Sequence, residues 1–108
     1  MYGAFYTKIR GVSWEGRQRL ISKLNMSGQL EVGTPLELVR EPDNPFDGNA
    51  VAVRTANGDM LGYLNKDING GISEKMRRGV RYRVTVSSVT GGIGIGNYGV
   101  NIKVEEIG

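Results

Sequence analysis

The amino-acid sequence predicts a mainly β fold, a small six-stranded open or closed barrel with two short helices in the order β-α-β-β-β-α-β-β. The chain has 108 residues, the common size of one domain, so we expect residues 1–108 to form a single domain. Short segments of alternating apolar and polar residues are separated by turn-forming residues. Strands and helices do not alternate regularly, which argues against a doubly wound parallel sheet.

The first third of the chain predicts a strand, a helix and a second strand. Residues 4–13 alternate imperfectly between apolar and polar side chains, as a strand does. Residues 17–24 carry leucine and isoleucine side chains at helical spacing, which predicts a short amphipathic helix. Residues 36–41 predict the next strand, after a turn-rich connection.

The middle third is organised around the densest turn signal in the sequence. Residues 42–49 contain two prolines, which fix φ, and Asp and Asn side chains, which can hydrogen bond to nearby backbone. Residues 50–56 then alternate as a strand. Residues 57–58 are an Asn-Gly pair, which predicts a tight hairpin leading into a strand over residues 60–64.

The last third predicts a second helix and two strands. Residues 66–78 have apolar side chains four apart on one face, although a pair of glycines in the middle would allow two shorter pieces. Residues 80–89 alternate clearly and residues 100–105 form a final alternating strand. Residues 90–99, which hold five glycines, predict a flexible hairpin loop between them.

The composition removes several kinds of chemistry. The chain has no cysteine, which excludes disulfides, thiolate catalysis and cysteine zinc sites, and no histidine, the commonest general base and metal ligand. We therefore expect a protein that binds rather than catalyses, with no cofactor and no metal site. No apolar run approaches the roughly 20 residues of a membrane span and no signal peptide is recognisable, so a cytoplasmic location without a membrane partner is expected.

The charge permits an anionic partner without requiring one. The formal net charge is +3 and the sequence pI is near 9.4. The basic residues gather in two stretches, Lys8, Arg10, Arg17, Arg19 and Lys75, Arg77, Arg78, Arg81, Arg83. A basic face is the electrostatic footprint of nucleic-acid binding. Two ordinary solvated surfaces would explain the same charges, and charge alone favours that simpler interpretation.

Two sequence patterns that can indicate a functional site are not supported by the residues around them. Residues 94–99 spell G-x-G-x-x-G, but they open no convincing helix and the chain ends nine residues later, so a dinucleotide site is not predicted. No P-loop sequence is present. Asp43, Asp47 and Asp59 with Glu41 could be imagined as Mg²⁺ ligands of a nuclease, but acidic residues in a proline-rich turn usually serve the turn itself.

The segment over residues 40–53 reads R-E-P-D-N-P-F-D-G-N-A-V-A-V. It resembles the hallmark of the HIRAN domain family, R-E-P-x-N-P-aromatic-D followed by x-N-A and an apolar strand. Agreement extends to residues 9–12, 16–18 and 61–64, so the resemblance covers most of residues 5–90. It implies a compact barrel related to the OB-fold with six strands and two helices, in agreement with the count from the sequence pattern.

The resemblance also implies a function. Family members occur as accessory domains of eukaryotic fork-remodelling ATPases and as small free-standing bacterial and phage-related proteins, and this chain, without an ATPase motif, resembles the latter. In the best-understood members the domain captures the 3′ end of single-stranded DNA. Two aromatic residues hold the terminal base, and an aspartate accepts a hydrogen bond from the 3′-hydroxyl. These positions fall on Trp14, Phe46 and Asp47.

Two departures from the family pattern remove candidate phosphate contacts. Ser13 stands where the DNA-binding members have an arginine before the first aromatic, and Tyr63 stands where they have a histidine. Lys66 matches a family lysine, and Arg17 or Arg40 could compensate. The predicted DNA-binding residues are Trp14, Phe46, Asp47, Tyr63, Lys66 and Arg17.

Other interpretations remain open at the level of sequence. Trp14 could pack on the core, Asp47 could cap its own turn, and Arg40 and Glu41 could form a structural salt bridge. The favoured function is a 3′-end-binding module in DNA repair or replication-fork processing, with a DNA-processing ATPase or nuclease as candidate partner. The alternative is a protein-interaction module that recruits such a partner without binding DNA. A metal-dependent nuclease is the third hypothesis.

Overall fold

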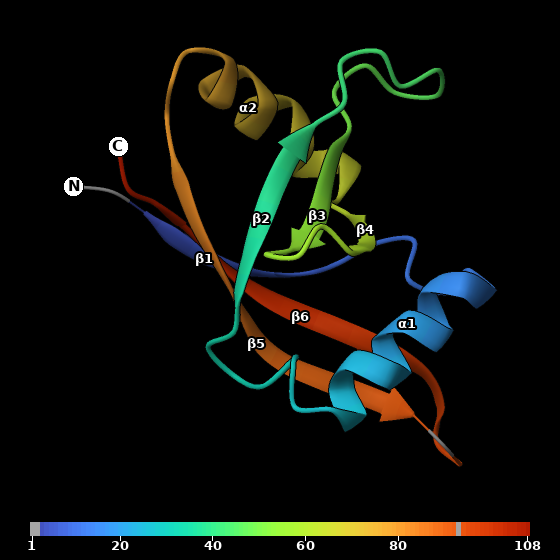
Figure 1. Cartoon of the computed structure of the whole chain (residues 1–108). Coiled ribbons are helices and arrows are strands. Elements are labelled where there is room, and N and C mark those ends of the chain that lie inside the picture. Colours follow the sequence, from blue (N-terminus) through green and yellow to red (C-terminus); the bar gives the residue numbers. More distant parts are fainter. Residues whose placement is uncertain (1–2, 93) are drawn as a thin grey trace.

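A single curled sheet of six strands, with two helices, makes up the computed structural model, which describes residues 3–92 and 94–108 (Figure 1). The elements are β1 Ala4–Lys8, α1 Glu15–Met26, β2 Pro35–Arg40, β3 Val51–Thr55, β4 Met60–Tyr63, α2 Lys66–Arg77, β5 Tyr82–Gly92 and β6 Gly96–Glu106. The strand order in the sheet is β1-β6-β5-β2-β3-β4, and every pair is antiparallel. The predicted fold class and element order are therefore confirmed.

The sheet curls far enough for its two edges to touch. Just after β1, Arg10 pairs with Tyr63 at the end of β4, and each backbone N–H donates to the other's carbonyl, at 2.8 and 2.9 Å. Gly62 makes this approach possible, because a Cβ there would meet the Arg10 carbonyl and the Ile9 side chain. The contact partly closes a barrel and brings the segment after β1 beside the end of β4.

The hydrophobic core fills the inside of the curl. Along β5 and β6, buried valine and isoleucine side chains alternate with more exposed residues, as in half-buried strands. In β3, Val51, Ala52 and Val53 are all buried. Helix α1 contributes Ile21 and Leu24, and α2 contributes Ile72. The helices cover opposite ends of the sheet (Figure 1), so their buried stripes anchor both ends of the barrel.

The hairpin between β5 and β6 is longer than the sequence predicted, and the predicted loop over residues 90–99 was wrong for most of that range. Strand β5 continues to Gly92, which is opposite Gly96 at the start of β6. Both glycines have positive φ, and a Cβ on Gly91 would meet the Asn97 carbonyl. The glycines therefore permit a tightly twisted, bulged hairpin instead of marking a loop.

Two other boundaries differ from the expectation. The first strand ends at Lys8 rather than at residue 13, since the chain turns at Gly11, whose φ is +74°. Helix α2 is continuous from Lys66 to Arg77 in spite of its central glycines. Its capped N-terminus and its buried face, which includes Ile72, compensate for the low helix propensity of glycine.

Candidate functional site

One hollow of about 880 Å³ opens where three segments meet: the chain after β1, the loop between β2 and β3, and the junction of β4 with α2. All six side chains singled out from the sequence line it: Trp14, Arg17, Phe46, Asp47, Tyr63 and Lys66. They come from positions spread over half of the chain, and the barrel closure brings them together. Whether they bind DNA remains a prediction.

Two aromatic side chains of the hollow are unusually exposed. Phe46 is 92% exposed and Trp14, directly before α1, is 68% exposed. Neither side chain is part of the hydrophobic core, so the alternative that Trp14 packs on the core is wrong. Large apolar side chains at this exposure in one hollow form a candidate binding surface for a flat, partly apolar group.

Asn44 folds the loop that carries Phe46. Its Oδ1 accepts hydrogen bonds from the backbone N–H groups of Phe46 and Asp47, at 2.9 and 3.1 Å. Its Nδ2 donates to Glu41 Oε1 at 3.0 Å. The loop also closes on itself, since the N–H of Ala50 donates to the Asp47 carbonyl at 3.0 Å. The exposed Phe46 is thus held by an ordered turn of the Asx type that the sequence predicted.

The Asp47 carboxylate is held by two donors on different elements. Oδ1 accepts from the backbone N–H of Asn49 at 2.9 Å, and Oδ2 accepts from Asn69 Nδ2 at 2.9 Å. These two hydrogen bonds, with help from the positive charge of Lys66, keep the pKa of Asp47 below its ordinary value. Asp47 therefore caps its turn, and each ionised oxygen still has a lone pair for a further donor.

Arg17 is fixed between two aromatic rings. Its guanidinium carbon lies 4.6 Å from the centre of the Trp14 ring and 5.4 Å from that of Tyr63. Nη1 also donates to the Gly11 carbonyl at 2.8 Å. The hollow thus holds a positive charge whose position is set by ring contacts and a backbone acceptor.

The Tyr63 hydroxyl is committed to Glu41. It donates to Glu41 Oε1 at 2.9 Å, and Arg54 Nη2 lies 3.9 Å from the other carboxylate oxygen. Burial and the nearby Glu41 carboxylate raise the pKa of Tyr63, so the phenol stays neutral. That Tyr63 contacts a phosphate stays a prediction; in this structure its ring supports Arg17.

Two residues of the site were missed by the sequence analysis. Glu41 was expected to pair with Arg40, but it joins Tyr63 to Asn44, while Arg40 Nε donates to Ser73 Oγ at 3.0 Å. Asn69 holds the Asp47 carboxylate from α2. Tyr63 lies 22 residues from Glu41, and Asp47 lies 22 residues from Asn69, so no local sequence pattern indicates these two contacts.

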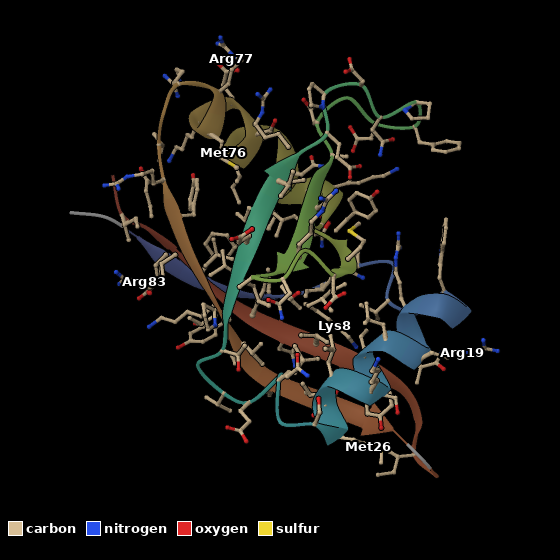
Figure 2. All side chains as sticks on the ribbon, viewed as in Figure 1. Lys8, Arg19, Met26, Met76, Arg77 and Arg83 are labelled. Carbon is tan, nitrogen blue, oxygen red and sulfur yellow. The ribbon has the colours of Figure 1, made fainter. Side chains whose placement is uncertain are left out.

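The basic stretch over residues 75–83 is partly paired with acidic residues. Lys75 lies 3.1 Å from a Glu106 oxygen, and Arg77 is paired with Glu74. Arg77 and Arg83 point outward from the molecule (Figure 2). Part of this charge is therefore neutralised by ion pairs on the surface, which agrees with the interpretation of the basic stretch as an ordinary solvated surface.

Residues 3–92 and 94–108 contain neither a group of side chains that could hold a metal ion nor a membrane-spanning helix. No group of three or more acidic residues there is arranged to hold a metal ion. Asp59, one of the imagined ligands, is instead bonded within its own turn. Its backbone carbonyl accepts from the Thr55 N–H at 2.9 Å, and its own N–H donates to Thr55 Oγ1 at 3.0 Å. No helix in this part of the chain is long and apolar enough to cross a membrane.

Comparison with known proteins gives one family. The HIRAN domain model matches residues 2–106. The helicase-like transcription factor of Oryctolagus cuniculus is 44% identical over 42 residues, which are 39% of this chain and 4% of that protein. The Fanconi-associated nuclease 1 homolog of Arabidopsis thaliana is 48% identical over 40 residues, 37% of this chain and 4% of that protein. The matches thus span only a small part of these relatives.

Two solved structures share the fold. The crystal structure of the HIRAN domain of human HLTF matches with a TM-score of 0.70 at 20% identity, over 96% of this chain and 74% of that one. A protein from Lactobacillus plantarum matches with a TM-score of 0.67 at 22% identity, over 99% of this chain and 100% of that one. At such identities the likeness supports the barrel architecture, and the chemistry must be argued from the hollow itself.

Proposed function

Because the chain belongs to the HIRAN domain family, we propose that it is a single-stranded DNA-binding module that holds the 3′-hydroxyl end of the strand in DNA repair or replication-fork processing. The observation that carries this proposal is the composition of one hollow. Two exposed aromatic side chains, Trp14 and Phe46, line it together with the ionised carboxylate of Asp47.

The aromatic pair suits a terminal nucleobase. Every base has a π-face, so Trp14 and Phe46 can stack on one without reading sequence, and each stack contributes about 1–3 kcal/mol. Phe46 is presented by the ordered Asn44 turn, so little conformational freedom is lost on binding. An unpaired base at a strand end can enter such a hollow, whereas a base inside a duplex is already stacked.

Asp47 supplies the preference for a free end. An ionised carboxylate accepts hydrogen bonds only, so it favours a terminal hydroxyl and repels a terminal phosphate. Asp47 is ionised at neutral pH, and the two hydrogen bonds that lower its pKa extend the ionised form to lower pH. An internal nucleotide has no 3′-hydroxyl, and its phosphate would lie against this carboxylate, so the hollow disfavours the middle of a strand.

Arg17 and Lys66 are the cations that face the phosphates of the bound strand. Both line the hollow, and Arg17 is held in place by the rings of Trp14 and Tyr63. Two phosphate contacts predict a shallow dependence of affinity on salt, roughly −0.7 in log–log slope per neutralised phosphate of a single strand. The affinity then depends more on stacking than on charge.

We propose no catalysis by this chain. The relatives whose names contain helicase-like and nuclease match it over about 4% of their lengths, which leaves nearly all of those proteins outside the similarity. The module would deliver a strand end to a DNA-processing ATPase or nuclease partner.

Competition between linear and circular DNA tests the proposal. A labelled single strand with a free 3′-hydroxyl is bound to the protein at low salt, and fluorescence anisotropy follows its displacement. The competitors are the same unlabelled sequence, either linear or ligated into a circle. The linear strand should compete and the circle should not. Equal competition would mean general single-strand binding without recognition of the end.

A protein-interaction module remains the second candidate, favoured by one observation. The Tyr63 hydroxyl is already donated to Glu41 and Ser13 offers no cation, so these two positions supply no phosphate donor and the cations of the hollow are Arg10, Arg17 and Lys66. Under this alternative, the exposed Phe46 would anchor a protein partner. Absence of any DNA binding at low salt, with the protein folded, would favour it.

A further inference from the structure

A buried side chain of α2 reaches the proposed hydroxyl acceptor. Asn69 is 4% exposed, one of three buried polar residues in the described part of the chain, and its Nδ2 donates to Asp47 Oδ2 at 2.9 Å. Helix α2 and the β2–β3 loop lie at the same end of the molecule (Figure 1). The contact therefore joins a helix to the loop that carries Phe46 and Asp47.

Asn69 projects from a firmly anchored part of α2. Asn65 caps the helix, since its Oδ1 accepts from the Asp67 N–H at 3.0 Å, and its carbonyl accepts from the Asn69 N–H at 3.0 Å. One turn further on, Ile72 is buried in the core. The next residue, Gly70, also lies close to the loop, because a Cβ added to it would be 3.5 Å from Asn49 Nδ2.

This anchoring determines how the carboxylate is oriented. With the Asn49 N–H alone, Asp47 would be held through Oδ1 by a donor of its own exposed turn, and its other oxygen would be free to rotate. The Asn69 amide holds Oδ2 from a different element. Two hydrogen bonds to different oxygens fix the plane of the carboxylate, and with it the direction of the lone pairs that remain.

We propose that Asn69 is a positioning residue, which aims the free lone pairs of Asp47 and so sets the preference for strands that end in a 3′-hydroxyl. This inference rests on the proposed function. A side chain with a structural role alone would change the stability of the protein, or the affinity for all strands alike. A positioning residue changes the part of the affinity that depends on the hydroxyl.

The part of the affinity that depends on the 3′-hydroxyl can be measured directly. Dissociation constants are determined at about pH 8 for one oligonucleotide ending in a 3′-hydroxyl and for the same oligonucleotide ending in 3′-deoxy, which lacks only the hydroxyl. The ratio of the two constants is the hydroxyl preference. It is measured in the wild type, in Asn69→Ala, and in Asn69→Leu, which roughly keeps the side-chain shape and removes the donor without adding a charge. Asn101→Ala is the control, because it removes an Asn-to-Ser88 hydrogen bond on β6, outside the hollow.

Asn69→Ala and Asn69→Leu should each lower the hydroxyl preference by roughly threefold to tenfold, the range of one net hydrogen bond. Affinity for the 3′-deoxy strand should change little in Asn69→Ala, and Asn101→Ala should keep the wild-type preference. If the folded Asn69 variants also keep it, the inference is wrong while the proposed function stands. If the wild type has no hydroxyl preference, the proposed function is wrong and the inference with it.

Discussion

Phe46→Ala separates binding from stability more sharply than any other substitution in the hollow. The side chain is 92% exposed and contributes nothing to the core, so its removal should change the free energy of unfolding by less than about 0.5 kcal/mol. The turn itself should persist, because Asn44 bonds to the backbone of residue 46 and not to its ring.

The expected loss of DNA affinity is much larger. One base–aromatic stack is worth about 1–3 kcal/mol, which corresponds to roughly a 5- to 150-fold weaker dissociation constant. Fluorescence anisotropy with a 3′-hydroxyl single strand measures this loss, and thermal unfolding measures stability. Tyr6→Ala is the matched control, since Tyr6 is an aromatic residue 68% exposed on β1 that does not line the hollow.

The two variants should behave differently. Phe46→Ala should lose affinity at an unchanged melting temperature, and Tyr6→Ala should bind as the wild type does. Unchanged affinity in Phe46→Ala, or an equal loss in both variants, would refute the assignment of Phe46 to the base. A large drop in melting temperature would refute the argument from exposure.

Three further substitutions test other parts of the account. Asp47→Asn should remove the hydroxyl preference at neutral pH. In the wild type, the hydroxyl preference should stay constant from about pH 8 to about pH 5. It should be lost only below pH 3.8, the ordinary pKa of an aspartate, because the lowered pKa of Asp47 keeps its carboxylate ionised down to that pH. Tyr63→Phe should cost about 0.5–1.5 kcal/mol of stability in denaturant unfolding, because the bond to Glu41 is lost. DNA affinity should stay within about twofold, because the ring under Arg17 remains; a larger loss would mean that the Tyr63 hydroxyl contacts a phosphate in the complex. Gly62→Ala should cost about 1–3 kcal/mol in the same assay, since the new Cβ meets the barrel closure; wild-type stability would show that the closure is not tight.

The fold was predictable where its signals are local. The alternation over residues 80–89 and the Asn-Gly pair at residues 57–58 both correspond to elements of the structure. In the turn between β3 and β4, Gly58 has positive φ and Asn57 does not, so the glycine follows the turn instead of forming its second central residue. The glycines of residues 90–99 led to a wrong prediction of a loop, because the conformation of this segment depends on the pairing of β5 with β6. Glycine permits a bulged hairpin as readily as a loop, and only the pairing of β5 with β6 decides between them.

The site was predictable only in part. The resemblance to the HIRAN family singled out six residues, and the structure brings them to one hollow. The residues that orient them were not predicted. Glu41 and Asn69 each act on a partner 22 residues away, so their contacts arise from the closure of the barrel and the docking of α2. An Asn inside a helix and a Glu at a strand end look ordinary in the sequence.

The most direct test of the central claim uses Trp14, the one tryptophan of the chain and a proposed stacking residue. Its fluorescence is followed at low salt while short single strands ending in a 3′-hydroxyl or a 3′-phosphate are added. Quenching by the hydroxyl-ended strand and not by the phosphate-ended strand is the result we predict, because it requires both the aromatic contact and the carboxylate of Asp47. Equal quenching by both strands, or none by either with the protein folded, would contradict recognition of the 3′ end.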